Sequence, residues 1–184
     1  MIDNLSFNVA QLLKDTVGAS RYVEVVADLG RLVPDLEPAE GTPGQERPVL
    51  SGEVRLMHTN AGVLATGELT GEAEVSCARC LNPVPVSIEV QLEEVFVPTI
   101  DMITGRSVKP DEDDEALWID EHHILDLAEV LRQDVLLELP VHVLCSDDCR
   151  GLCPNCGQNL NEGACCCRVE GGDPRWAALR DLLR

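Results

Sequence analysis

The longest regular pattern in the sequence is an alternation of apolar and polar residues at positions 63–77. Apolar residues and glycine occupy one set of alternate positions, and glutamate or threonine occupies most of the other set. This period of two predicts a β-strand with one buried face. Gly67 and Gly71 fall on the apolar face, where we expect a bend, a bulge or the close approach of another element.

The next stretch, "VPVSIEVQLEE", alternates in the same way, and "LNPVP" between the two stretches is typical of a turn. Together they predict a long β-hairpin with "CARC" at its tip. Two further strands are predicted at 21–30 and 49–58 from the same period. Residues 30–48 are rich in proline, glycine and glutamate, and they predict a loop.

Three segments have a helical pattern. A short amphipathic helix is predicted in residues 7–18, and a terminal helix in "GGDPRWAALRDLLR", which has an Asp-Pro pair at its start. Residues 119–140 contain the third, where Asp126 and Glu129 fit a capping box. The predicted apolar face of that helix consists of Leu127, Leu131, Val135 and Leu139.

Composition favours a folded globular protein, because 45% of the 184 residues are hydrophobic. Aromatic residues make up only 3%, so we expect a core of Val, Leu, Ile and Ala. No apolar run approaches the roughly 20 residues of a membrane helix. The first residues, "MIDNLSFNVAQLLKD", lack the basic and apolar regions of a secretory signal. We therefore predict a cytoplasmic protein with no membrane partner.

The net charge of −19 is concentrated in part of the chain. Residues 111–139 contain one basic and 11 acidic residues. Such a chain repels phosphate at long range, which disfavours non-specific binding of nucleic acid. Residues 98–116 predict a solvated acidic linker. The least unfavourable region for RNA is the C-terminal part, with Arg150, Arg168, Arg175, Arg180 and Arg184.

Nine cysteines are the main chemical feature of the sequence. Disulfides do not persist in a reducing cytosol, which leaves metal ligation or reactive thiols. A C-x2-C pair on a tight turn supplies two of the four ligands of a zinc ion. The chain has two such pairs and enough further cysteines for two sites of four thiolates. One arrangement groups Cys77, Cys80, Cys145 and Cys149, and separately Cys153, Cys156, Cys165 and Cys167.

Other arrangements remain open. Cys145, Cys149, Cys153 and Cys156 also suit one site, with the first C-x2-C pair meeting the last cysteines. The C-x3-C-x2-C run in "CRGLCPNC" matches an iron–sulfur spacing, but antiparallel strands precede it. A thioredoxin-like pair should open a helix, which "CARCLNPVPV" cannot do. Inert buried thiols explain one or two cysteines only.

All-thiolate ligation predicts closed structural sites, since catalytic zinc keeps an open position and usually includes His, Glu or Asp. Of the four histidines only His142 lies near a cysteine. We find no Gly-rich phosphate loop and no G-x-S-x-G motif. The sequence therefore predicts that the protein is not an enzyme.

Four segments together resemble the YceD family of bacteria and plastids: "SCARCL", "LDLAEVLRQDVLLELP", "CSDDCRGLCPNCGQNLNEGACCC" and "DPRWAALRDLL". The resemblance runs from about residue 20 to the C-terminus. In the family pattern a polar residue usually separates the last two cysteines. Here that residue is Cys166, so the resemblance implies that Cys165 and Cys167 are ligands and Cys166 is spare.

The resemblance implies a non-catalytic role in accumulation of large-subunit (23S) ribosomal RNA, and thus in ribosome biogenesis. The implied partners are the precursor of this RNA or ribosomal and assembly proteins. Because of the charge, we expect the acidic stretch at 111–139 to meet a basic protein. The alternative is a zinc-stabilised protein–protein adaptor with no direct role with RNA.

These observations predict an α+β fold: a mainly antiparallel β-sheet domain, a few helices and a C-terminal Cys-rich zinc-binding knob with one or two structural zinc ions. We divide the chain into a helix and β domain at 1–97, an acidic linker and helix at 98–139, and the Cys-rich segment with the last helix at 140–184. We expect the three parts to form one compact unit.

Overall fold

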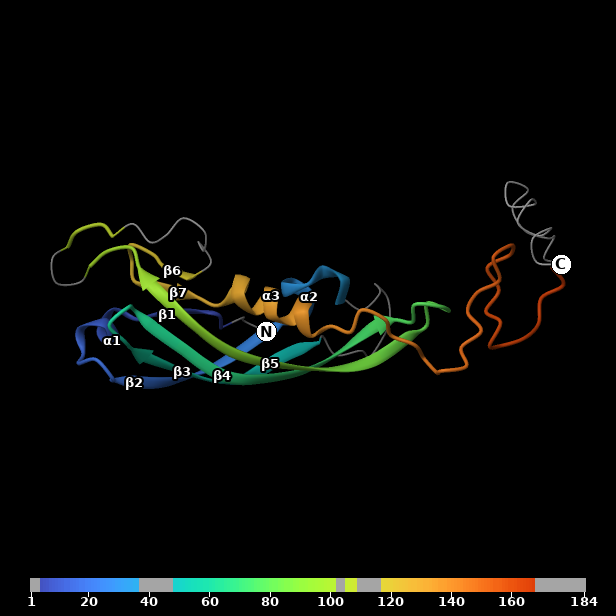
Figure 1. The fold of residues 1–184 in the computed structure, drawn as a ribbon, viewed down its shortest axis with the longest axis horizontal. Coiled ribbons are helices and arrows are strands. Elements are labelled where there is room, and N and C mark those ends of the chain that lie inside the picture. The colour runs from blue at the N-terminus through green and yellow to red at the C-terminus, as the bar shows by residue number, and fades with distance from the viewer. Residues whose placement is uncertain (1–3, 37–47, 102–104, 109–116, 168–184) are drawn as a thin grey trace, which may run out of the picture. The chain divides into compact units, whose positions relative to one another are not determined.

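The computed structural model describes residues 4–36, 48–101, 105–108 and 117–167 (Figure 1). The terminal helix predicted in 171–184 and much of the predicted acidic linker lie outside these ranges. The chain divides into two compact units. Unit 1 comprises Met1–Val75 and Val84–Val141, and unit 2 comprises Ser76–Pro83 and His142–Arg184.

A five-stranded sheet forms most of unit 1, and Figure 1 shows helices α2 and α3 on one face of it. The strand order is β2-β3-β4-β5-β6. β2 pairs antiparallel with β3, β3 pairs antiparallel with β4, and β6 lies parallel to β5. The predicted mainly antiparallel sheet is therefore confirmed. The strands are β2 (Ser20–Asp28), β3 (Val49–His58), β4 (Val63–Ser76), β5 (Pro83–Pro98) and β6 (Trp118–Ile119).

The remaining elements of unit 1 are short. β1 (Ser6–Asn8) pairs antiparallel with β7 (Ile124–Asp126) in a second, two-stranded sheet. No helix in the described residues is long and apolar enough to cross a membrane. The helices are α1 (Ala10–Lys14), α2 (Leu29–Leu32), the 3-10 turn η1 (Pro34–Leu36) and α3 (Ala128–Glu138).

Two predictions near the N-terminus are wrong in part. The helix predicted from Phe7 begins only at Ala10, because Phe7 pairs with Leu125 in the second sheet. The loop predicted at 30–48 begins with α2 and η1 instead. The Asp28 side chain accepts a hydrogen bond from the backbone N–H of Gly30 and caps α2. The buried side chains that hold this segment on the core are Leu29, Leu32, Val33 and Leu36.

The apolar face predicted for α3 is confirmed. Leu127, Leu131 and Val135 are fully buried in the core, and Leu139 packs against it. The predicted capping box is not formed: the N-cap of α3 is Leu127, which makes no side-chain capping hydrogen bond, and Asp126 accepts a hydrogen bond from the backbone N–H of Ala128, two residues on.

Glu129 hydrogen-bonds along the helix and not back to the N-cap backbone. Its carboxylate accepts two hydrogen bonds from Arg132, at 2.8 and 2.6 Å, and one from Gln133 at 3.0 Å. The pKa of Glu129 is lowered to about 2, mainly by the hydrogen bonds from Arg132. This exposed i,i+3 pair lies on the solvent side of α3.

The two glycines on the inner face of β4 are explained by the close approach of β3. A Cβ atom at Gly67 would lie 2.6 Å from the carbonyl oxygen of Glu53. At Gly71 it would lie 2.7 Å from the carbonyl oxygen of Val49. Either contact is too short for a side chain, so the expected close approach is confirmed. The long strands also supply most of the core on this face, through Val25, Leu50, Val54, Leu56, Ala65, Leu69, Ile88, Val90, Leu92 and Phe96.

Candidate metal centres

The described part of unit 2 has no hydrophobic core of its own. In residues 76–83 and 142–167 the buried residues are four cysteines and Gly151, and the leucine and valine side chains are all at least partly exposed. None of these residues belongs to the hydrophobic core cluster. A segment this small needs cross-links or metal ions to fold. The buried cysteines are Cys77, Cys80, Cys149 and Cys153.

The first centre consists of Cys77, Cys80, Cys145 and Cys149, whose sulfur atoms all lie within 4.8 Å of one another. The Cys77 and Cys149 sulfurs are 3.9 Å apart, and those of Cys80 and Cys145 are 3.5 Å apart. Four sulfurs at about 2.3 Å from a zinc ion in a regular tetrahedron are roughly 3.8 Å apart. The thiols therefore already have the spacing that a tetrahedral metal ion requires.

A tight turn at the tip of the β4–β5 hairpin positions two of these thiols. The Cys77 N–H donates to the Asn82 carbonyl at 2.8 Å, and the Leu81 N–H donates to the Cys77 carbonyl at 3.0 Å. Leu81 follows the second cysteine with a φ of 62°, in the left-handed region. The Ala78 N–H donates to the Val143 carbonyl at 2.8 Å, which joins the turn to the segment that supplies Cys145 and Cys149.

The groups around the first centre shift the pKa values of its thiols in different directions. Backbone N–H groups, first that of Cys80, lower the pKa of Cys77 to about 6. The Cys145 N–H is also directed at the Cys77 sulfur, at 3.4 Å. The side chain of Asn161 lowers the pKa of Cys149. Hydrogen bonding to the neighbouring thiols, first Cys149, raises the pKa of Cys145 to about 12. The first centre thus combines two thiols with a lowered pKa, Cys77 and Cys149, and two with a raised pKa, Cys80 and Cys145.

The second centre consists of Cys153, Cys156, Cys165 and Cys167, again with all sulfurs within 4.8 Å of one another. Gly157 follows the C-x2-C pair with a φ of 73°, and its N–H donates to the Cys153 carbonyl at 2.9 Å. Glycine adopts this left-handed conformation without strain. The same turn thus occurs in both centres, with Gly157 in the place of Leu81.

The thiols of the second centre differ in pKa in the same way. Backbone N–H groups, first that of Cys156, lower the pKa of Cys153 to about 6. Hydrogen bonding to the neighbouring thiols, first Cys156, raises the pKa of Cys167 to about 12. Cys156 is exposed, and Cys165 and Cys167 are half-buried, so this centre is the more accessible of the two.

The structure brings together the eight predicted cysteines as two separate groups of four. The alternative single site needs Cys149 and Cys153 around one ion, but they belong to different groups. The same division breaks up the C-x3-C-x2-C run that an iron–sulfur cluster would use. Cys166 and His142 are exposed and lie outside both groups. Metal binding by these eight residues stays a prediction.

Two residues that the sequence did not single out support the first centre. Arg79, between the cysteines of the hairpin tip, donates from Nη1 to the Cys149 carbonyl at 2.9 Å. Its own carbonyl accepts a hydrogen bond from the Leu152 N–H at 3.1 Å. Asn161 donates from Nδ2 to the Cys149 sulfur at 3.3 Å. Neither contact follows from cysteine spacing, because both join segments that are distant in sequence or separated by a turn.

We expect metal binding to release protons and to weaken as the pH falls. Near pH 7 the thiols of Cys145 and Cys167, with a pKa of about 12, are protonated in the metal-free protein. Each must lose its proton to become a thiolate ligand. Below about pH 6, Cys77 and Cys153 also take up protons, so the loss of affinity becomes steeper there. Calorimetric titration with zinc in buffers of different ionisation enthalpy measures this release, and a binding enthalpy independent of the buffer would contradict it.

The fold and the two four-cysteine groups define a β-sheet protein with a small cysteine-rich second unit. Residues 65–183 match the family described as "Large ribosomal RNA subunit accumulation protein YceD". The match covers more than half of the chain and includes all nine cysteines. The chain belongs to the YceD family.

Relatives occur in bacteria and plants. An uncharacterized protein of Mycobacterium tuberculosis is 37% identical over 137 residues, which cover 73% of this chain and 62% of the relative. "Large ribosomal RNA subunit accumulation protein YCED homolog 1, chloroplastic" of Arabidopsis thaliana is 30% identical over 140 residues, covering 72% of this chain and 43% of that protein. The uncharacterized protein YlbN of Bacillus subtilis is 27% identical over 117 residues, covering 63% of each chain. The chain thus spans less than two thirds of the length of these relatives, and no solved structure matches it.

Proposed function

We propose that this protein is a non-catalytic, zinc-binding member of the YceD family that supports accumulation of large-subunit (23S) ribosomal RNA in the cytoplasm. The observation that carries the proposal is the family match over residues 65–183. Relatives from Arabidopsis thaliana and Zea mays are named as large ribosomal RNA subunit accumulation proteins. The second candidate function is a zinc-stabilised adaptor between proteins, which the acidic surface described below favours.

Zinc is the ion that the donor set favours. Soft thiolate ligands in a tetrahedral arrangement suit zinc, and four protein ligands leave no open position for a substrate. Both centres offer four sulfurs at suitable spacing. Backbone N–H groups directed at the sulfurs of Cys77 and Cys153 stabilise the thiolate form that the metal needs. These features support a structural role for the metal and a protein without catalytic activity.

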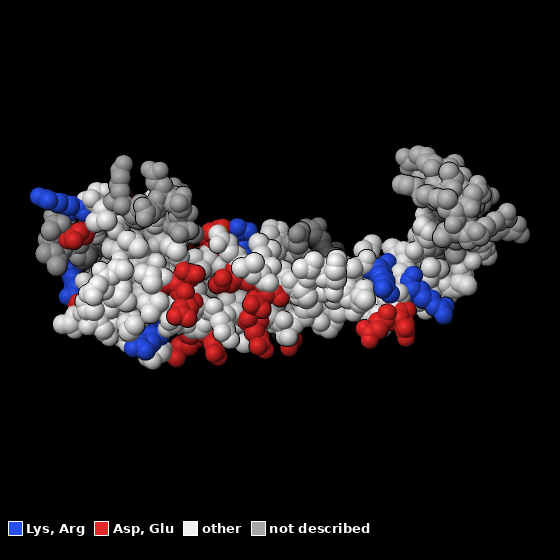
Figure 2. Space-filling view, viewed as in Figure 1, with Lys and Arg blue, Asp and Glu red and all other residues white. Residues whose placement is uncertain are grey.

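The outer face of the sheet in unit 1 supports a basic protein as the partner. Figure 2 shows acidic side chains gathered over the long strands. Glu53 on β3 lies directly opposite Glu24 on β2 and Glu68 on β4, so three glutamates form a row across three strands. We call this row, with the residues around it, the acidic face. It continues with Glu72 on β4 and with Glu89 and Glu93 on β5.

The glutamate row is unfavourable for the isolated protein. Like charges directly opposite each other on adjacent strands repel, which lowers the stability of the sheet. Among the residues that the structure describes, Glu24, Glu53 and Glu68 form no ion pair. A basic segment of a ribosomal or assembly protein would relieve this repulsion, whereas RNA phosphates would add to it.

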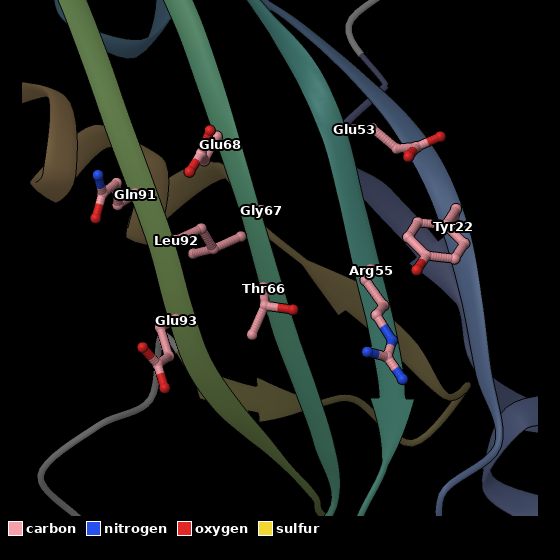
Figure 3. Close-up of a pocket in the computed structure, with 9 residues that line it drawn as sticks. All are labelled: Tyr22, Glu53, Arg55, Thr66, Gly67, Glu68, Gln91, Leu92 and Glu93. Carbon is pink, nitrogen blue, oxygen red and sulfur yellow. The ribbon is translucent and has the colours of Figure 1, made fainter.

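Beside this row lies a shallow hollow of about 480 Å³ with groups suited to protein contacts (Figure 3). Tyr22, Arg55 and Thr66 form the neighbouring row across β2, β3 and β4. Tyr22 is 62% exposed, and the Nε atom of Arg55 is buried without a hydrogen-bond partner among the described residues. An exposed aromatic ring is a feature that protein interfaces use.

Neutralising the glutamate row should raise the stability of the protein slightly and weaken its binding to a basic partner. We expect a Glu24→Gln, Glu53→Gln, Glu68→Gln variant to be slightly more stable than the wild type, because the repulsion is removed. Its association with a basic partner should fall roughly tenfold or more at low salt. The measurements are a urea titration and quantitative recovery of crosslinked partners from the protein's own cells.

A comparison variant, Glu121→Gln with Glu138→Gln, removes charge from two exposed residues of the acidic stretch at 111–139, outside the glutamate row. Loss of partners in this variant alone would place the contact in the acidic stretch. If the acidic face is the contact, this variant should recover partners at the wild-type level. If the glutamate-row variant also does so, the acidic face is not the contact surface.

The function itself is tested by depletion of the protein in its own cells, followed by measurement of 23S relative to 16S ribosomal RNA. The proposal expects a selective fall in 23S RNA, which the wild-type gene restores. Gentle crosslinking of a tagged chain then identifies the associated molecules. A defined protein partner with an unchanged ratio of 23S to 16S RNA would favour the adaptor instead.

A further inference from the structure

Asn161 links the two centres. Its side chain donates from Nδ2 to the sulfur of Cys149, a member of the first centre, at 3.3 Å. Its Oδ1 accepts the N–H of Arg150, the residue after Cys149, at 2.8 Å. Asn161 itself lies in residues 157–164, the loop that joins Cys156 to Cys165 of the second centre. The Asn161 amide thus contacts the first centre, and the loop that carries it lies between two cysteines of the second centre.

The loop is built to hold this amide in place. The Leu160 N–H donates to the Gly151 carbonyl at 2.9 Å, and the Asn161 N–H donates to Oδ1 of Asn159 at 3.0 Å. Gly151 is buried, and a Cβ atom there would lie 2.9 Å from the carbonyl oxygen of Arg79, which belongs to the hairpin tip of the first centre. The loop, the segment at 149–152 and the hairpin tip are therefore in direct contact within unit 2.

We infer that Asn161 couples the two metal centres, so that an ion in the second centre strengthens binding of an ion in the first. This inference rests on the proposed function, since it needs both centres to bind metal. An ion held by Cys156 and Cys165 fixes both ends of the loop and presents the Asn161 amide to Cys149. Because binding free energies are linked, an ion in the first centre strengthens the second by the same factor.

The expected strength of the coupling follows from the effect of hydrogen bonds to metal ligands in other proteins. Groups that hydrogen-bond to metal ligands orient them, and their loss typically weakens metal binding about 10- to 100-fold. An N–H directed at a ligating sulfur also stabilises its negative charge. Without the second ion the loop keeps more conformational freedom, so ordering Asn161 against Cys149 costs more free energy.

The sharpest test is Asn161→Asp, which keeps the shape of the side chain. One carboxylate oxygen still accepts the Arg150 N–H, whereas the donor that faces Cys149 becomes a second oxygen that repels the thiolate. The matched control is Asn60→Asp, which makes the same substitution at an exposed residue of the turn between β3 and β4 in unit 1, outside both centres. Metal binding is measured by titration of the full chain with Co²⁺, whose absorption reports tetrahedral thiolate ligation, and with Zn²⁺ against a chromophoric chelator.

We expect the wild type and Asn60→Asp to take up two ions per chain in one cooperative transition. Asn161→Asp should also bind two ions, but in two separate steps, with the weaker step shifted about 10- to 100-fold. In a Cys156→Ser background, which disables the second centre, the first centre should be weakened, and adding Asn161→Asp should change it little further.

The outcomes distinguish this inference from the proposed function. A single cooperative transition in Asn161→Asp, unchanged from the wild type, would overturn the coupling while leaving zinc binding intact. Full additivity of Cys156→Ser and Asn161→Asp would overturn it as well. Failure of the wild type to bind any ion would overturn the proposed function and, with it, the coupling.

Discussion

Removal of the metal by a strong chelator is expected to unfold the described part of unit 2 and to leave unit 1 folded. Residues 76–83 and 142–167 bury four cysteines and Gly151 but no other apolar side chain, so thiolate–metal bonds must replace a hydrophobic core. Structural zinc supplies on the order of 10 kcal/mol of folding free energy in small domains. Unit 1 keeps a core of its own that contains no cysteine.

Hydrogen exchange followed by mass spectrometry measures this effect peptide by peptide. Peptides from 142–167 should lose their protection in the chelated protein, and peptides from β3 to β5 should keep theirs. Cys77→Ser should lose the ion of the first centre and the protection of the peptides that carry Cys145 and Cys149, because Cys77 is fully buried in that centre. Cys166→Ser is the control: this thiol is exposed and outside both centres, so metal content and protection should not change. Unchanged protection of 142–167 without metal would show that something other than metal holds unit 2.

The second large effect is expected in unit 1, where Leu131→Ala should lower the free energy of unfolding by about 2–5 kcal/mol. Leu131 is fully buried on the inner side of α3, within the core cluster of the sheet. Truncation removes its apolar contacts and leaves a cavity that the surrounding strands only partly fill. Metal content should stay at the wild-type level, because Leu131 and the two centres belong to different units.

The same helix offers a matched control. Leu137→Ala makes the same substitution at a residue that is 82% exposed, so its effect should stay within about 0.5 kcal/mol. Urea titration of both variants, together with zinc analysis, tests the pair. If the two variants were equally stable, α3 would not contribute the core packing described above.

The strands at 49–58 and 63–76 could be predicted from sequence because residues two apart share one face of a strand. That pattern is local, and burial of one face imposes it on each strand separately. The apolar face of α3 was predictable for the same reason, with a helical period. The short strands β1, β6 and β7 have no such pattern, because two or three residues are too few to show a period. Their pairing depends on partners more than 20 residues away.

The acidic face is a further feature that only the register revealed. Each of the three glutamates is an ordinary outward-facing residue of an alternating strand. Glu24, Glu53 and Glu68 become a row only when β2, β3 and β4 are aligned. The sequence directed attention instead to the acidic stretch at 111–139, where charge is dense along the chain.

The sequence by itself determined that cysteine pairs sit on tight turns, since a C-x2-C turn needs only neighbouring residues. It also determined the number of thiols available and the strand–turn–strand context of the first pair. Only the tertiary structure decided which pairs meet: Cys77 and Cys80 with Cys145 and Cys149, and Cys153 and Cys156 with Cys165 and Cys167. It likewise placed Asn161 against Cys149. Local spacing sets the shape of a turn, whereas the meeting of distant turns depends on how the whole chain between them folds.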